Sequence, residues 1–129
     1  MSVELTLLNW STVLLGAYVS TQAIFYRIQH GFIFSATSRD EEPPPNIWTA
    51  RGNKALRNFL ETYPAFIALA VAIELSGRSE PLTQWGAHIW FWSRWIYLPL
   101  YIFGVPYVRS LVWSVAGIGL MLMFLGVAL

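Results

Sequence analysis

The chain has 129 residues, of which 56% are hydrophobic and 12% are charged, and its net charge is +1. About a quarter of the residues are charged in a typical soluble domain, so this composition indicates a single integral membrane domain over residues 1–129. The basic residues alternate with acids or lie in apolar segments, which gives no basis for nucleic-acid binding. Because the chain has no cysteine, it lacks disulfides, thiolate metal sites and a cysteine nucleophile, and any thiol must come from a ligand.

Four apolar segments are long enough, at about 20 residues each, to cross a hydrocarbon core of about 30 Å. The first segment lacks a basic region and a small-residue cleavage site, so we expect a retained span rather than a signal peptide. The second and third connections are short, which favours antiparallel neighbours in an all-α, integral membrane four-helix bundle. The expected helices cover residues 3–26, 54–75, 85–103 and 108–128.

The connection over residues 27–53 is the only long one. Its run Arg39-Asp40-Glu41-Glu42 is followed by three prolines, which break a helix. Basic residues cluster in this connection and its flanks, whereas the second connection has only Arg78. Because Lys and Arg accumulate on the cytoplasmic side of membranes, we expect a cytoplasmic loop and two non-cytoplasmic termini.

A polar stripe enters the second apolar helix. Arg51, Lys54, Asn58 and Glu61 are spaced three, four and three residues apart, so they lie on one helix face. The sequence then becomes apolar from Tyr63 onward. Polar side chains in a membrane-spanning helix need polar or charged partners.

The third helix carries Arg94 near the middle of an apolar, Trp-rich span. Counting about 1.5 Å per residue places Arg94 and Glu61 at a similar depth of roughly 13 Å, so we expect the two side chains to pair. Two interpretations of this pair stay open. It is a structural ion pair that holds two helices in register, or it belongs to a ligand-binding site.

A column of further polar groups favours the ligand-binding interpretation. Such a column has more donors than one acid neutralises, which favours a bound anion. Arg27 and Arg109 are expected at the same membrane face, although snorkelling of either side chain to the interface is an alternative. The groups expected above the pair are Lys54, Asn58, Tyr97 and Tyr101.

No metal site is expected. His30 and His88 are far apart in sequence, and no carboxylate pair or Ser-His-acid set is present. Gly117 and Gly119 in the last helix indicate close helix packing.

These motifs resemble the membrane-associated proteins in eicosanoid and glutathione metabolism, the MAPEG family. The second-helix pattern is Lys54-Ala55, Asn58, Glu61 and Pro64. The similar segment that follows it contains Arg94, Tyr97, Tyr101, Gly104-Val105-Pro106 and Arg109. Arg27 ends the first helix where family members place an arginine, and the resemblance covers nearly the whole chain.

The resemblance implies a homotrimer of four-helix subunits that binds glutathione between neighbouring subunits at the cytoplasmic side. It implies a microsomal glutathione transferase-like member of the bacterial type, in the inner membrane, with an apolar electrophile or lipid as second substrate and no metal. Arg109 corresponds to the arginine credited with stabilising the thiolate, and is the implied catalytic residue. The implied glutathione-binding residues are Arg27, Lys54, Asn58, Glu61, Arg94, Tyr97 and Tyr101.

Three positions depart from the family pattern. Lys54 replaces an arginine and loses the bidentate fork. Ile28 and Thr62 stand where the leukotriene-synthase branch has an arginine and a tyrosine. These differences argue against eicosanoid synthesis and favour a general glutathione transferase or peroxidase. The alternative is a noncatalytic membrane subunit or scaffold, whose polar column is structural.

Overall fold

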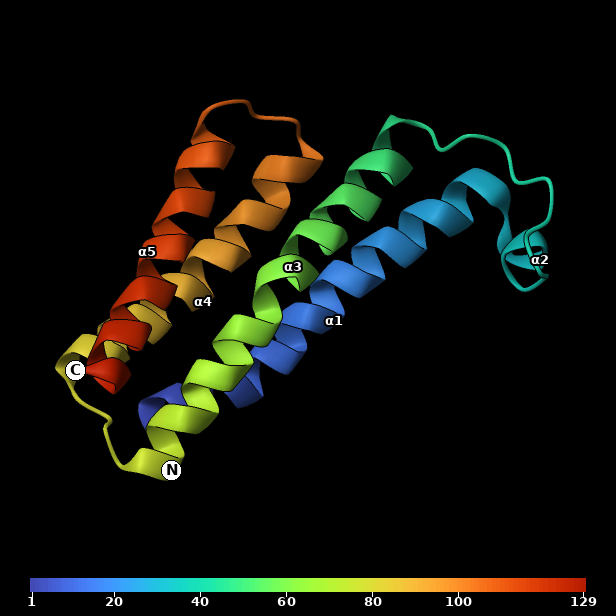
Figure 1. Cartoon of the computed structure of the whole chain (residues 1–129). Helices are drawn as coiled ribbons and strands as arrows, with labels where there is room; N and C mark the ends of the chain where they lie inside the picture. The colour runs from blue at the N-terminus through green and yellow to red at the C-terminus, as the bar shows by residue number, and fades with distance from the viewer.

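The computed structural model covers residues 1–129 and is entirely helical, as the sequence predicts. Four long helices pack lengthwise, and a single short helix lies in the first connection (Figure 1). Both termini and the α3–α4 connection lie at one end of the bundle, and the other two connections lie at the opposite end. The helices are α1 (Val3–His30), α2 (Phe32–Ser35), α3 (Ile47–Ser76), α4 (Pro81–Ile102) and α5 (Val108–Ala128).

The helix ends differ from the expected ends, because capping residues set them rather than the limits of the apolar runs. α1 continues to His30 instead of residue 26, and α3 begins at Ile47 instead of residue 54. The side chain of Asn46 caps α3 by accepting a hydrogen bond from the backbone N–H of Thr49 at 2.9 Å. A reciprocal capping box between Glu80 and Thr83 likewise starts α4 before residue 85. The expected 27–53 loop is therefore shorter and contains α2.

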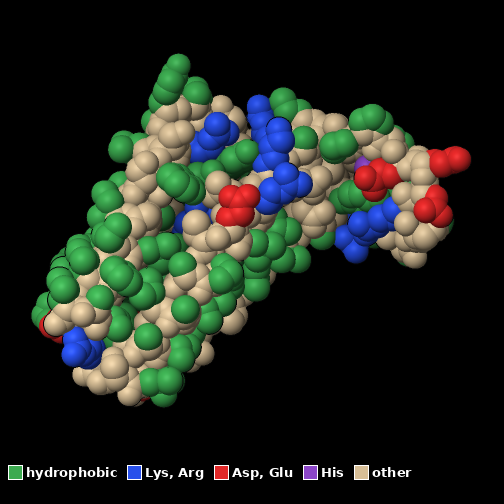
Figure 2. All heavy atoms as spheres, in the orientation of Figure 1, with side chains coloured by type: hydrophobic (Ala, Val, Ile, Leu, Met, Phe, Trp, Pro, Cys, Tyr) green, Lys and Arg blue, Asp and Glu red, His purple; other side chains and the backbone are tan.

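Aromatic stacking forms the centre of the bundle, where α1, α3 and α4 meet. Trp90 is fully buried and stacks on Phe66, with ring centroids 4.0 Å apart. Tyr18 stacks on Phe59 at 4.5 Å. Only 29 of the 129 residues are buried, and apolar side chains cover much of the outer surface (Figure 2). Such a surface suits lipid or other membrane-embedded partners rather than water.

Close backbone contact joins α4 to α5. A Cβ atom added at Gly119 would lie 2.6 Å from the carbonyl oxygen of Gly86, and a Cβ atom at Gly86 would lie 2.6 Å from the carbonyl oxygen of Gly119. The expected packing role of Gly119 is confirmed. Gly117 makes no such contact within the subunit, because a Cβ atom there meets no atom of another helix within 4 Å.

Hydropathy distinguishes the helices. α3, with a mean hydropathy of 1.4, and α5, with 2.2, are long and apolar enough to cross a membrane by composition alone. α1 and α4 do not meet that test. The Trp, Tyr and Arg side chains of α4 lower its mean hydropathy. The interpretation of α4 as a membrane span therefore depends on its contacts with α3 and α5.

A buried acid lies at the end that carries both termini. Glu4 is fully buried, and its carboxylate accepts hydrogen bonds from the hydroxyls of Ser79 at 2.8 Å and Thr83 at 2.7 Å. The backbone N–H of Ser2 donates to Glu74 at 2.8 Å. These bonds fix the start of α1 against the end of α3 and the start of α4.

Candidate functional site

A buried guanidinium lies at the centre of the polar column. Arg94 is 1% exposed, and its Nη1 donates to Oδ1 of Asn58 on α3 at 3.0 Å. Aromatic faces supply the other close contacts. The guanidinium carbon lies 4.5 Å from the ring centroid of Tyr97, 5.4 Å from that of Phe59 and 5.7 Å from that of Tyr18. Cation–π attraction therefore offsets part of the desolvation of this charge.

The expected Glu61–Arg94 pair does not form within the subunit. Glu61 is exposed, and the amide of Asn58 occupies the position facing Arg94. Three residues advance a helix by about 300°, so Glu61 is rotated about 60° from Asn58 around the axis of α3. The pair was expected because Glu61 and Arg94 lie at a similar depth in the membrane. Depth alone does not determine which side of α3 faces Arg94.

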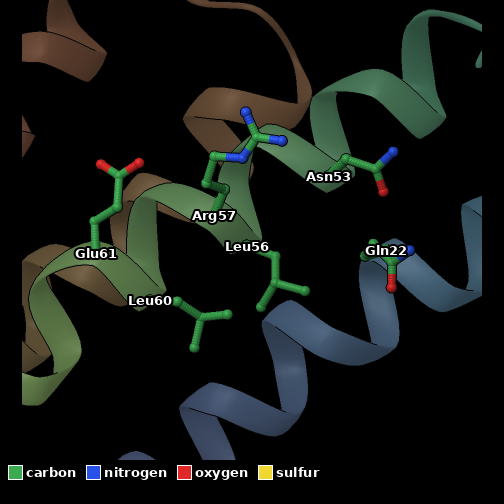
Figure 3. Close-up of a pocket in the computed structure, with 6 residues that line it drawn as sticks. All are labelled: Gln22, Asn53, Leu56, Arg57, Leu60 and Glu61. Atoms are coloured by element: carbon green, nitrogen blue, oxygen red, sulfur yellow. The ribbon is translucent and has the colours of Figure 1, made fainter.

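Glu61 belongs instead to a surface groove between α1 and α3 with a volume of about 480 Å³. Figure 3 shows Glu61 and Arg57 pointing away from α1, whereas Leu56 and Leu60 point towards it. Sequence reasoning did not select this groove. The spacing of Asn53, Arg57 and Glu61 at every fourth residue was the available signal. The lining residues are Gln22, Asn53, Leu56, Arg57, Leu60 and Glu61.

A continuous series of side-chain contacts connects the buried guanidinium to the start of α5. The Tyr97 ring, next to Arg94, lies 5.6 Å from the Tyr101 ring, centroid to centroid. The guanidinium carbon of Arg109 in turn lies 4.5 Å from the ring centroid of Tyr101. Arg109 is the second residue of α5 and is half-buried. Asn58, Arg94, Tyr97, Tyr101 and Arg109 thus form one connected set.

Two further expected site residues lie outside this set. Nη1 of Arg27 donates to the carbonyl oxygen of Ala23 on its own helix at 3.1 Å. Lys54 is exposed and its ammonium group makes no hydrogen bond within the subunit. Neither residue is joined to the connected set by a hydrogen bond within one subunit.

Arg51, the first residue of the predicted polar stripe, stabilises the end of α4 rather than lining the polar column. Its Nη1 donates to the carbonyl oxygen of Ile102 near the end of α4 at 3.1 Å. A Cβ atom at Gly104 would lie 2.6 Å from Nη2 of Arg51. The guanidinium therefore packs under the α4–α5 turn and bonds an end-of-helix carbonyl.

The buried centre retains three N–H groups without a hydrogen-bond partner: Nε and Nη2 of Arg94, and Nε1 of Trp90. Both residues line a small cavity of about 20 Å³, together with Thr62 and residues of α5. That volume admits a single water molecule. The cavity leaves Arg94 with donors that the protein itself does not satisfy.

Sequence reasoning also missed Tyr18. It is fully buried, and its hydroxyl donates to the backbone carbonyl oxygen of Arg94 at 2.6 Å. A tyrosine in the middle of an apolar helix requires a hydrogen-bond partner when it is buried, and this was the available signal. Tyr18 fixes α1 against α4 beside the guanidinium.

Comparison with known proteins gives one match, to the MAPEG family, over residues 5–129. The chain belongs to the MAPEG family. No curated protein and no solved structure matches it. MAPEG proteins are integral membrane helical bundles, which agrees with the four long helices and their apolar outer surface.

Glutathione is the ligand typical of MAPEG proteins, and the polar groups present fit its chemistry. Glutathione has two carboxylates, one ammonium and one thiol. The connected set supplies two guanidinium groups and two phenols as donors, and Glu61 is an exposed acid one turn from Asn58. No cluster of three or more His, Cys, Asp or Glu side chains is placed to hold a metal ion.

Proposed function

We propose that this MAPEG protein is a microsomal glutathione transferase-like enzyme that activates the thiol of glutathione for attack on apolar electrophiles. The observation that carries the proposal is the contact series from Arg94 through Tyr97 and Tyr101 to Arg109. It presents positive charge and phenolic donors along one path and contains no acid. A peptide with two carboxylates complements such a path.

Binding is assigned to the inner part of the series. The phenols of Tyr97 and Tyr101 are donors for carboxylates, whereas Arg94, which is 1% exposed, adds its positive charge beside the Tyr97 ring without contacting the ligand. Lys54 adds an ammonium group, although it lacks the planar fork of an arginine. Glu61 is the acceptor for the glutathione ammonium. We propose that Arg27 completes a site between subunits of a homotrimer, which accounts for its separation from the other residues within one chain.

Thiol ionisation is assigned to Arg109. A cysteine thiol has a pKa of about 8.5, and a nearby guanidinium favours its charged form. Arg109 lies in the first turn of α5, where the positive end of the helix adds to this effect. The thiol proton passes to solvent, the sulfur forms a bond to an electrophilic carbon, and the leaving group departs with the bonding electron pair.

Titration calorimetry with glutathione and the thiolate absorbance near about 240 nm test this proposal on purified protein in detergent. Wild-type protein should bind glutathione and show the thiolate band at pH 7 to 8. Arg109→Ala should keep affinity within a few-fold, lose the band and lower turnover with a chlorodinitrobenzene by roughly tenfold to a hundredfold. Arg78→Ala is the control, because Arg78 lies at the opposite end of the bundle and bonds the carbonyl oxygen of Val127.

Binding without a thiolate band would contradict the catalytic proposal and favour a noncatalytic glutathione-binding protein. No binding at all would favour the scaffold alternative. The proposed second substrates are apolar electrophiles that enter from the lipid.

We also propose that the α1–α3 connection faces the cytoplasm and that both termini face the other side. The proposal is supported by the excess of Lys and Arg at that end and by the shared end of the two termini in Figure 1. Because the chain has no cysteine, Thr37→Cys and Ser79→Cys each provide a unique labelling site. The two variants should react with a membrane-impermeant maleimide from opposite sides, and labelling of both from one side would exclude this topology.

A further inference from the structure

The short helix α2 lies beside the end of α1 rather than beyond it (Figure 1). It sits on the side of the bundle away from α4 and α5. α2 covers Phe32–Ser35 and follows Gly31, whose φ of 86° lets the chain turn sharply between the two helices. This placement puts α2 along the outer surface of the bundle.

Specific contacts hold α2 in this orientation. The ring of Phe34 packs on His30 with centroids 5.5 Å apart, and His30 packs on Tyr26 at 4.4 Å. The guanidinium of Arg39 lies 4.1 Å from the Tyr26 ring centroid, and its Nε donates to the carbonyl oxygen of Ser35 at 3.0 Å. α2 is therefore anchored by one face, and the opposite face is fixed outward.

The outward face is apolar. Ile33 is 87% exposed, Phe32 is 76% exposed and Ile28, in the last turn of α1, is 73% exposed. We name these three residues the anchor patch. We propose that the anchor patch inserts into the interfacial region of the lipid bilayer and binds neutral, zwitterionic lipid.

The length of α1 supports a bilayer as the occupant. Its 28 residues extend about 42 Å at 1.5 Å per residue, which exceeds a hydrocarbon core of about 30 Å. The last turns of α1 thus lie at headgroup level. Amphipathic segments bury their apolar faces about 5–10 Å into this boundary.

The anchor patch also continues the exposed apolar side of α1. Ile24 is 55% exposed and lies one turn before Ile28 on the same helix face, whereas Val19, nearer the middle of α1, is 43% exposed on another side. Trp48, beside the guanidinium of Arg51 at 5.5 Å, lies at the same end of the bundle. Tryptophan next to basic side chains is typical of a membrane–water interface.

Charge determines the class of lipid. The connection after α2 contains Asp40, Glu41 and Glu42, and the Glu42 carboxylate accepts a hydrogen bond from the hydroxyl of Tyr26. Arg39 is held by Tyr26 and Ser35. The segment therefore presents no excess of free positive charge to an anionic surface. Neutral phosphatidylcholine is sufficient for the proposed insertion.

Spin labelling of single-cysteine variants in phosphatidylcholine vesicles tests the proposal, and the cysteine-free chain needs no background substitutions. Ile33→Cys and Phe32→Cys receive a nitroxide, and its collision rates with oxygen and with a water-soluble nickel chelate are compared. Val19→Cys is the lipid control and Glu41→Cys is the water control. The oxygen-to-nickel ratio at residues 32 and 33 should exceed that at residue 41 several-fold and lie below that at residue 19.

A ratio at residues 32 and 33 equal to that at residue 41 would overturn the proposal, because the patch would then lie in water. Labels that both reagents fail to reach would also overturn it, because another protein surface would then cover the patch. Replacing phosphatidylcholine with an anionic lipid mixture should leave the ratio unchanged. A rise only in anionic vesicles would show that charge rather than the apolar patch binds the membrane. These outcomes are independent of glutathione binding.

Discussion

Arg94 donates from Nη1 to Oδ1 of Asn58 at 3.0 Å, and this is the only hydrogen bond that its guanidinium makes, although the residue is 1% exposed. A neutral amide, not a carboxylate, thus faces the buried charge. The charge is stabilised within the subunit by this bond and by the faces of three aromatic rings. It therefore retains attraction for an anionic ligand, which a carboxylate partner would have satisfied.

Asn58→Ala should destabilise the protein by about 1–3 kcal/mol, because it removes the only side-chain hydrogen-bond acceptor of a buried guanidinium. Thermal unfolding in detergent micelles measures the change. Asn53→Ala is a matched control on the same helix, since Asn53 lines the open groove rather than the core. The control should change the free energy of unfolding by less than about 0.5 kcal/mol. Equal losses in the two variants would argue against a structural role of the Asn58–Arg94 bond.

Glu61→Gln should leave the unfolding temperature unchanged, because Glu61 is exposed and does not pair with Arg94. It should weaken glutathione binding by about tenfold, which corresponds to the loss of one charge-assisted hydrogen bond. Calorimetry of the same preparation measures both quantities, and Glu41→Gln in the loop serves as the control. If Glu61→Gln lowered the free energy of unfolding as much as Asn58→Ala does, the result would favour a Glu61–Arg94 ion pair.

The sequence predicted the contact series but not the partner of Arg94. Arg94, Tyr97 and Tyr101 follow helical spacing, so their shared face could be read directly from the chain. The rotation of α3 about its own axis could not, because it depends on how Phe59 and Ala55 pack in the core. That rotation turned Asn58 inward and Glu61 outward.

Specific side-chain contacts, some local and some between distant residues, explain the other differences between sequence and structure. The run of acids and prolines correctly indicated a break in the helices, but α2 is held by Tyr26, His30 and Arg39. Glu4 in the first turn of α1 has the position of an ordinary helix-dipole acid. Its burial depends on hydroxyls 75 and 79 residues away. No local pattern contains that information.

Glu4→Ala should destabilise the bundle by about 1–3 kcal/mol, because it removes the carboxylate that accepts from the hydroxyls of Ser79 and Thr83, and Thr83 keeps only the carbonyl oxygen of Glu80 as an acceptor. Glutathione affinity should not change, since Glu4 lies at the end of the bundle opposite the contact series. Unfolding followed by near-ultraviolet circular dichroism, together with calorimetry, separates the two effects. A variant that unfolds normally but loses ligand binding would contradict this assignment.

Gly119→Ala should destabilise the protein by about 1–3 kcal/mol through overpacking. The added Cβ atom would lie 2.6 Å from the carbonyl oxygen of Gly86 and 2.8 Å from the backbone nitrogen of Trp90. Both contacts are with backbone, so α4 and α5 must move apart to admit the methyl group. Gly117→Ala, two residues away on α5, meets no atom within 4 Å and should stabilise the helix by up to about 1 kcal/mol. Thermal unfolding of the two variants should therefore shift in opposite directions, and a shared decrease would show that α5 packs through Gly117 against a surface outside the single subunit.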